Sequence, residues 1–544
     1  MSWARRSASV TYHWEARISD LRGKLSIDLL FVLVLTFFAS PLRAQQTPAP
    51  LISQARELIQ QEKLAEAEAK LLEAEKVEPN SLQVQRLFGV VYERQGKYSQ
   101  AEAALEKVVH LSGEKDPETL FLLCKVEFAL EKTDEALALA RQISQLPGSD
   151  PRPLYAVGRL LRENRHATEA VVELERAHTA APENPAVTTE LVAAYLDEHR
   201  VPEAQGVFEP LLKTARYADL LQAGSRLAET DHLEAAVAAF ERAVAERPSA
   251  FDGLFDLAFA YYRQGSFAKS LEVLDRTPNP QTSNSGDYHY LRGKVEAALH
   301  HDQRAAEELR EALRLQPDNE SVCVDAGLFF SHFQDFWKAL EIFQVCTVKL
   351  PDSVAVETGQ GLTYFHLGKY PEAIATFRKV LSLNPQMDAA REALGFLLYV
   401  SGRLPEARQV LEERMSARKA DFYLYFLHAL VLQRQDKQRN REAVALSLNE
   451  ALARNPNFAP AYFQRGKIAF ERGDLEPALA DFQTATRVDP AYAEPYYPIA
   501  QVYFKQGNRV AAEQAQARFN SLNREREEKE QEQQVESRLV QALR

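Results

Sequence analysis

Apolar and small residues recur along this chain with a period of about 34 residues, which is typical of helix–turn–helix repeats. The period is clearest in two stretches, one beginning near Val354 and the other near Pro460. In each, a small residue and a large apolar residue three places later share one face of a first helix, and Ala and a large apolar residue share one face of a second. A proline ends the unit because it cannot continue the helix. The matching positions are Gly361 and Gly466, Gly368 and Gly473, Ala373 and Ala478, Phe377 and Phe482, and Pro385 and Pro490.

The same pattern extends over almost the whole chain and predicts about fourteen units. The segment Pro278–Asp287 is rich in Pro, Ser and Asn and predicts a hinge. This hinge would separate an array over residues 45–277, whose first units are degenerate, from one over residues 288–522, each of about seven units. Leu146–Pro153 is a lesser break. Residues 523–544 contain strong helix formers of mixed charge and predict a solvated capping helix.

These residues resemble the tetratricopeptide repeat family over roughly Ala49 to Leu522, and the tenth and thirteenth units come close to its consensus. The tryptophan of that consensus is missing from its place in every unit. The resemblance implies an all-α fold, an α-solenoid in which antiparallel helix pairs stack into a right-handed superhelix. It also implies that the first helices of the pairs line the concave face.

The first 44 residues lie outside the repeats. A basic lead is followed by the apolar run Leu29–Ala39 and by small residues, so we expect an export signal that is cleaved after Ala44. The alternatives are a membrane anchor over residues 25–42, at the lower limit for a span, and a mistaken start or a cytosolic protein. Either of the first two interpretations places the array outside the cytoplasm, in the periplasm or cell envelope if the source is bacterial.

The three cysteines, Cys124, Cys323 and Cys346, fall at apolar repeat positions, and we interpret them as small buried side chains. The alternative is a Cys323–Cys346 bridge within one repeat in an oxidising compartment. Packed helix axes lie about 8–10 Å apart, whereas disulfide-bonded Cα atoms lie within about 7 Å. Helix geometry therefore argues against this bridge without excluding it.

Charge and local motifs give no sign of catalysis or nucleic-acid binding. The formal net charge is −12, and no long Lys/Arg block follows the N-terminal region, which disfavours nucleic acid as a partner. The chain has no H-E-x-x-H, G-x-S-x-G, P-loop or dinucleotide fingerprint. The pair His300–His301 lies in a turn without spaced Cys or carboxylate ligands. We therefore expect no enzyme, no cofactor, and no catalytic or metal site.

The family geometry places the second, fifth, ninth and twelfth positions of each unit on the concave face. These positions hold Arg in the fourth unit and mostly aromatic rings in later units, and both kinds of side chain anchor interfaces. The pattern predicts an aromatic groove for an extended or helical peptide, with a basic patch nearer the N-terminus that could hold carboxylates. The alternative is that many rings pack between helices, since a register error of one place exchanges groove for core. The candidate partner-binding residues are Arg152, Tyr155, Arg159, Arg162, Phe255, Phe259, Tyr262, Tyr290, Phe365, Phe396, Tyr399, Tyr423, Phe426, Phe463, Lys467, Phe470, Tyr497 and Phe504.

The sequence thus predicts a non-enzymatic scaffold that binds a protein or peptide partner in its concave groove and acts in the cell envelope. Contact with a membrane would be through the N-terminal segment alone, if that segment is uncleaved. One alternative is an accessory subunit of a polysaccharide, glycosyl-transfer or secretion system. Another is a structural assembly factor that self-associates through the edges of its repeats.

Overall fold

The computed structural model describes residues 48–543 except 114–115, 148–149, 278–283, 416–419 and 437, and it describes side chains as far as residue 527. The helices group into two compact units, Met1–Gly148 and Ser149–Arg544, which we call the N-terminal unit and the C-terminal unit. The predicted leader, residues 1–44, lies outside the described residues, as does the anchor over residues 25–42. So do residues 278–283 of the predicted hinge.

In its described residues, the N-terminal unit contains six helices: α1 (Ala49–Gln60), α2 (Leu64–Val77), α3 (Leu82–Arg94), α4 (Tyr98–Ser112), α5 (Pro117–Ala129) and α6 (Thr133–Gln145). The C-terminal unit contains the others: α7 (Pro151–Glu163), α8 (Ala167–Ala180), α9 (Pro185–Asp197), α10 (Val201–Thr214), α11 (Tyr217–Glu229), α12 (Leu233–Glu246), α13 (Phe251–Arg263), α14 (Phe267–Asp275), α16 (Gly286–Ala298), α17 (Asp302–Leu315), α18 (Glu320–His332), α19 (Phe336–Lys349), α20 (Val354–His366), α21 (Tyr370–Leu383), α22 (Asp388–Val400), α23 (Leu404–Met415), α24 (Phe422–Gln435), α25 (Arg441–Arg454), α26 (Ala459–Arg472), α27 (Leu475–Val488), α28 (Tyr496–Lys505) and α29 (Arg509–Leu543).

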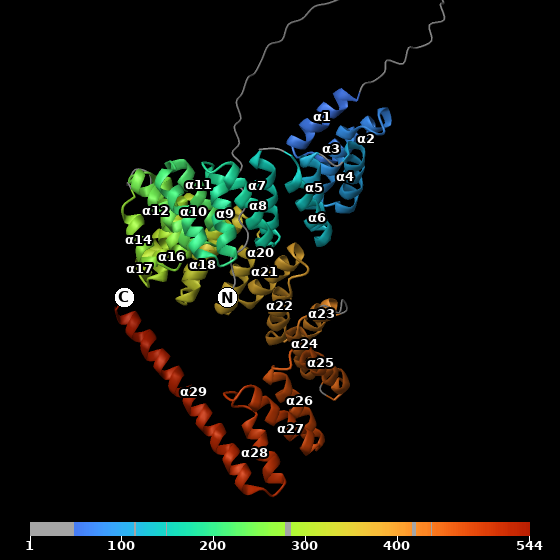
Figure 1. Ribbon diagram of the computed structural model, residues 1–544. Coiled ribbons are helices and arrows are strands. Elements are labelled where there is room, and N and C mark those ends of the chain that lie inside the picture. The colour runs from blue at the N-terminus through green and yellow to red at the C-terminus, as the bar shows by residue number, and fades with distance from the viewer. Residues whose placement is uncertain are drawn as a thin grey trace, which may run out of the picture. The chain divides into compact units, whose positions relative to one another are not determined.

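In the described part of the chain, consecutive helices form fourteen pairs, from α1 with α2 to α28 with α29 (Figure 1). Within the residues that the structure describes, no strand interrupts them. The first helices of five successive pairs begin 34 residues apart, at Gly286, Glu320, Val354, Asp388 and Phe422. The prediction of an all-α solenoid of about fourteen repeats is confirmed.

Many pairs are held together by a large side chain of the second helix that packs on a bare stretch of the first. In the pair α11–α12, a β-carbon at Gly224 would stand 2.5 Å from Cε1 of Phe240, closer than carbon atoms can approach. Gly361 of α20 faces Phe377 of α21 in the same way, with a corresponding distance of 3.0 Å. Both phenylalanines are buried. The absence of a side chain on one helix therefore creates the space that the ring of the other fills.

The turn between the helices of a pair places one residue in the left-handed region of backbone conformation. Gly368 takes this place with a φ of 69°, which glycine adopts without steric cost. Arg165 and His300 take it in other pairs, with φ values of 67° and 59°, at a cost of about 1 kcal/mol each. His300 thus forms the turn, and the next residue, His301, hydrogen-bonds through Nδ1 to Glu296 at 2.6 Å.

Cys323 of α18 and Cys346 of α19 form a disulfide bond, with their Cα atoms 6.0 Å apart. Our interpretation of these two cysteines as unbonded was wrong, because the usual spacing of helix axes overestimates their separation here. Gly327, one turn after Cys323, lets Phe343 pack against the backbone of α18 and brings the two helices close together. Cys124 is free and buried, and burial raises the pKa of its thiol to about 12.

Of the two breaks predicted from composition, one coincides with the boundary between the compact units and the other lies within the C-terminal unit. The boundary between the two compact units falls at residues 148–149, inside the lesser break Leu146–Pro153. On either side of the predicted hinge, α14 and α16 pack together, and the Tyr288 hydroxyl donates to the Leu274 carbonyl at 3.1 Å. A hinge at residues 278–287 stays a prediction. The predicted cap over residues 523–544 is not a separate helix, since α29 continues to Leu543 (Figure 1).

The packing within pairs predicts opposite effects for one substitution at two neighbouring helices. Gly224→Ala should lower the free energy of unfolding by about 1–3 kcal/mol, because the new β-carbon collides with the Phe240 ring. Gly206→Ala in α10 should raise it by up to about 1 kcal/mol, because its β-carbon meets nothing within 4 Å and alanine favours the helix. Urea unfolding followed by circular dichroism measures both. A Gly224→Ala chain as stable as the wild type would contradict the role of this contact.

Candidate functional site

Three successive first helices of the C-terminal unit bring aromatic rings around one cavity of about 250 Å³. Phe365 comes from α20, Phe396 from α22 and Tyr423 from α24, and all three were predicted from the sequence as groove residues. We call this cavity the aromatic pocket; its other lining residues are Leu362, Phe377, Ala389, Glu392, Ala393 and Leu397.

The rings of the aromatic pocket are held against the core while part of each stays accessible. Phe365 and Phe396 meet edge to face, with ring centroids 6.1 Å apart. Tyr423 lies 5.9 Å from Phe426 and 6.1 Å from Phe458, measured between ring centroids. All three pocket rings are half-buried and pack on the apolar core of the C-terminal unit. The pocket is therefore a mostly apolar recess whose rings pack on the core.

Glu392 is the charged residue of the aromatic pocket, and the search for aromatic residues in the sequence missed it. It stands at the fifth position of its repeat, a position that the family geometry already assigned to the concave face. Burial, together with repulsion from the nearby Asp421 and Asp388, raises the pKa of its carboxyl from 4.5 to about 7. The signal that could have found it is an acidic residue among aromatic residues at concave positions.

A second recess, the C-terminal pocket, lies among α26, α28 and α29 and has a volume of about 520 Å³. It brings together three predicted residues, Phe470, Tyr497 and Phe504. Tyr497 and Phe504 are 47% and 68% exposed, so this recess is shallow. The ammonium group of Lys505 lies 4.3 Å from the centroid of the Phe470 ring and covers it.

The predicted basic patch on α7 is neutralised by carboxylates. Its ion pairs are Arg152–Asp150, Arg159–Glu163 and Arg162–Glu190, with N–O distances of 2.7, 3.3 and 3.0 Å. The Arg162 side chain is only 5% exposed, so its place among the partner-binding residues was wrong. Glu190 comes from α9 in the next repeat, a contact that the pattern of α7 alone does not show. Tyr155 and Arg159 do line a cavity of about 280 Å³, which they share with Glu190 and Arg226.

The remaining predicted residues divide between core and surface. Phe426 is 8% exposed and lies 4.9 Å from the Phe458 ring centroid, so it belongs to the core and its assignment to the groove was wrong. Phe259 is 44% exposed. The half-buried residues, whose role in binding stays a prediction, are Phe255, Tyr262, Tyr290, Tyr399, Phe463 and Lys467.

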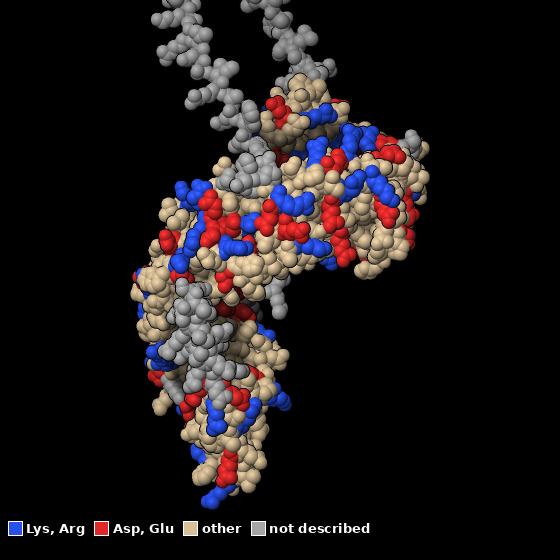
Figure 2. Space-filling model, turned by 90° about the vertical axis from the view of Figure 1, so that its left-hand side faces the viewer, with Lys and Arg blue, Asp and Glu red and all other residues tan. Residues whose placement is uncertain are grey.

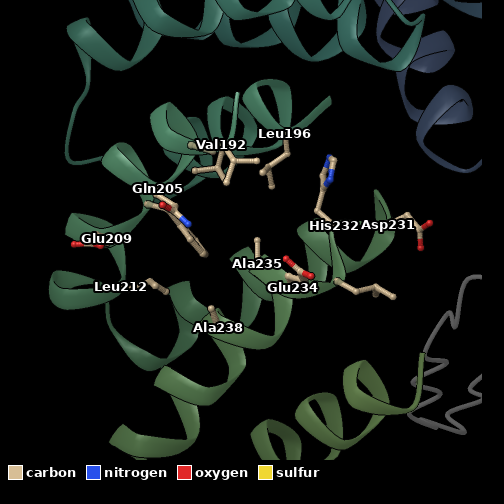
Figure 3. Close-up of a pocket in the computed structure, with 14 residues that line it drawn as sticks. Val192, Leu196, Gln205, Glu209, Leu212, Asp231, His232, Glu234, Ala235 and Ala238 are labelled. Atoms are coloured by element: carbon tan, nitrogen blue, oxygen red, sulfur yellow. The ribbon is translucent and has the colours of Figure 1, made fainter. Parts of the chain in front are cut away.

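A cavity of about 620 Å³ lies among α9, α10 and α12. Val192 stands where several other pairs carry glycine, and it lines this cavity together with Phe208. Figure 3 shows Val192 and Leu196 projecting from α9 toward the space between α10 and α12. The walls of this cavity carry Glu209 and Glu234 beside the apolar groups.

The carboxylates of Glu102, Glu106 and Glu127 in the N-terminal unit lie within 4.8 Å of one another. Lys132 pairs with Glu102, and its Nζ lies 3.8 Å from Oε2 of Glu127. The pair Lys97–Glu68, at 2.9 Å, has the same arrangement one repeat earlier. This acidic group is therefore part of a recurring ion pair between neighbouring repeats.

Charges of both signs alternate over the face that Figure 2 shows. Among the residues that the structure describes, no helix is both long and apolar enough to span a bilayer.

Comparison with known families identifies the repeats. Models of the tetratricopeptide repeat match residues 52–117, 227–295 and 364–429, and a TPR repeat model matches residues 466–507. The chain is a tetratricopeptide repeat protein. Such repeats generally bind protein or peptide partners and typically serve as non-catalytic scaffolds, so a protein-interaction scaffold is the function that the family supports. No curated protein matches this chain.

Solved structures that match this chain include the APC/C hetero-tetramer Cut9–Hcn1, which is 11% identical with a TM-score of 0.32, the match covering 84% of this chain and 96% of that one. A tetratricopeptide repeat protein from Parabacteroides merdae is 18% identical over 44% of this chain and 93% of its own, with a TM-score of 0.32. YrrB, described as a TPR protein with an unusual peptide-binding site, is 18% identical over 34% of this chain and 96% of its own, with a TM-score of 0.29. At these values the matches carry no information on the partner of this repeat protein.

The raised pKa of Glu392 predicts that stability falls as the pH rises. Between its ordinary value of 4.5 and about 7, the unfolded chain has released the proton that the folded chain retains, so the free energy of unfolding decreases across this window. Glu392→Gln should flatten that decrease and should be more stable than the wild type by about 1 kcal/mol at about pH 8, after allowance for solvent screening.

Urea midpoints measured across this pH range test the prediction. Glu372→Gln on the exposed side of α21 is the matched control and should leave the profile unchanged. Parallel profiles for the wild type and Glu392→Gln would show that Glu392 ionises normally.

Proposed function

We propose that this repeat protein is an exported scaffold that binds a segment of a protein partner at the aromatic pocket of its C-terminal unit. The observation that carries the proposal is the convergence of Phe365, Phe396 and Tyr423, from three successive first helices, around one cavity. Aromatic side chains that present large, ordered apolar surface are frequent anchors of protein interfaces. Leu362, 41% exposed, extends the apolar surface at this site.

The setting that we propose is outside the cytoplasm, in the cell envelope if the source is bacterial. Two features support it. The N-terminal sequence has the order of a basic lead, an apolar run and a small-residue cleavage site. The Cys323–Cys346 bond is of the kind that persists in oxidising compartments and is rare in the cytosol.

Removal of two pocket rings should weaken binding without unfolding the array. A library of short peptides displayed on phage is panned against the full chain, and the selected peptides are titrated against variants. Phe365→Ala with Phe396→Ala should lower affinity by at least about tenfold, because two apolar anchors are lost. Trp337→Ala is the control, since this ring is 64% exposed on α19, a second helix, and does not line the pocket.

Circular dichroism melting confirms that each variant is folded. Peptides that bind the double variant as tightly as the wild type would overturn the proposal, and so would a chain that self-associates and selects no peptide.

The proposed export predicts the covalent state of the chain recovered from its producer. Mass spectrometry should show a chain that begins at Gln45. After denaturation without reductant, an alkylating reagent should label one of the three cysteines, Cys124, and after reduction it should label all three. A retained leader would favour the membrane anchor, and three reactive thiols before reduction would argue against an oxidising compartment.

A further inference from the structure

Several carboxylates at buried or half-buried positions of the C-terminal unit are paired with cations of the chain itself. The partners are Lys379 for Glu357 at 2.5 Å, Arg414 for Asp388 at 2.6 Å, and Arg465 for Asp481 at 2.7 Å. Glu392 differs, because it has no ion pair or hydrogen bond to any residue that the structure describes. A carboxylate that is partly desolvated and lacks a cation is unfavourable, and a ligand cation would relieve this cost.

Several aromatic rings of the array also have cationic partners in the chain itself. Outside the aromatic pocket, lysine and arginine groups of the chain cover several of them: Lys294 lies over Tyr262, Lys369 over Trp337, Arg434 over Tyr399, Lys467 over Phe463 and Lys505 over Phe470, at 4.3–5.5 Å from the ring centroids. In the described part of the chain, no lysine or arginine covers Phe365, Phe396 or Tyr423. The pocket therefore joins three uncovered rings to one unpaired carboxylate.

Its surroundings add negative potential and limit the size of an occupant. Asp421 accepts a hydrogen bond from the Phe422 amide at 2.6 Å and is close enough to Glu392 to oppose its ionisation. The volume of about 250 Å³ lies below the usual range of small-molecule pockets and suits a single side chain. Apolar walls with one carboxylate match a flexible apolar stem that ends in a cation.

We propose that the aromatic pocket takes one lysine or arginine side chain of the partner segment, with its cationic group at Glu392 and its stem against Phe365, Phe396 and Tyr423. This inference rests on the proposed function and adds the chemistry of the partner. The rings attract the cation through their negative faces, and the carboxylate supplies the ion pair. With a formal net charge of −12, the chain also favours the approach of a basic segment.

The test uses the full chain and the peptides selected by panning. We expect the selected peptides to share a lysine or arginine at one position. Replacement of that residue by norleucine, which keeps the apolar stem and removes the charge, should lower affinity for the wild-type chain by about tenfold or more. Glu392→Gln should weaken the basic peptide similarly and leave the norleucine peptide almost unaffected, so the two changes are coupled.

Control and contrary outcomes separate this inference from the proposed function. Glu372→Gln should bind the basic peptide as the wild type does. If the selected peptides require Phe365 and Phe396 but share no basic position, the proposal of a cationic side chain is wrong and the proposed binding at the aromatic pocket is kept. Equal affinity of the basic peptide for the wild type and Glu392→Gln would have the same meaning. Peptides that bind independently of both rings would overturn both proposals. If Glu392→Gln does not fold, the affinities of the basic peptide and the norleucine peptide for the wild-type chain still test the role of the charge.

Discussion

The contact between a bare stretch of the first helix and a large side chain of the second is the interaction on which the whole array depends. At Gly224 the helix has no side chain, and the Phe240 ring fills the space. This contact sets the distance between two helices, and the left-handed residue in the turn sets their antiparallel direction. Pairs that share this contact have a similar shape, so they can stack on one another in a similar way.

Most of the fold could be predicted because this constraint repeats. The small and large positions recur with little change, and they revealed the period, the number of units and the pairing of the helices. The same register brought Phe365, Phe396 and Tyr423 onto one face, although they are far apart in the sequence.

What could not be predicted depends on contacts between repeats. The position of Arg162 in its repeat predicts the concave face, but its side chain is buried in an ion pair with Glu190 of the next repeat. The bond between Cys323 and Cys346 required a helix separation that Gly327 sets, and average helix spacing conceals it. Glu392 occupied a concave position in the sequence, but its significance depends on what does not surround it. Whether a carboxylate has an ion-pair partner depends on residues that are distant in the sequence, and the repeat period does not show which of these lie beside it.

Val192 shows how such an array can change. In a protein with one central core, a side chain too large for its place disturbs packing in many directions. Here most contacts of a pair are with its neighbours, so a cavity lies beside Val192 and α10 while the Gly224–Phe240 contact in the next pair keeps its close packing. A point mutation can therefore change the surface of one repeat and create a new recess there while the other repeats keep their packing.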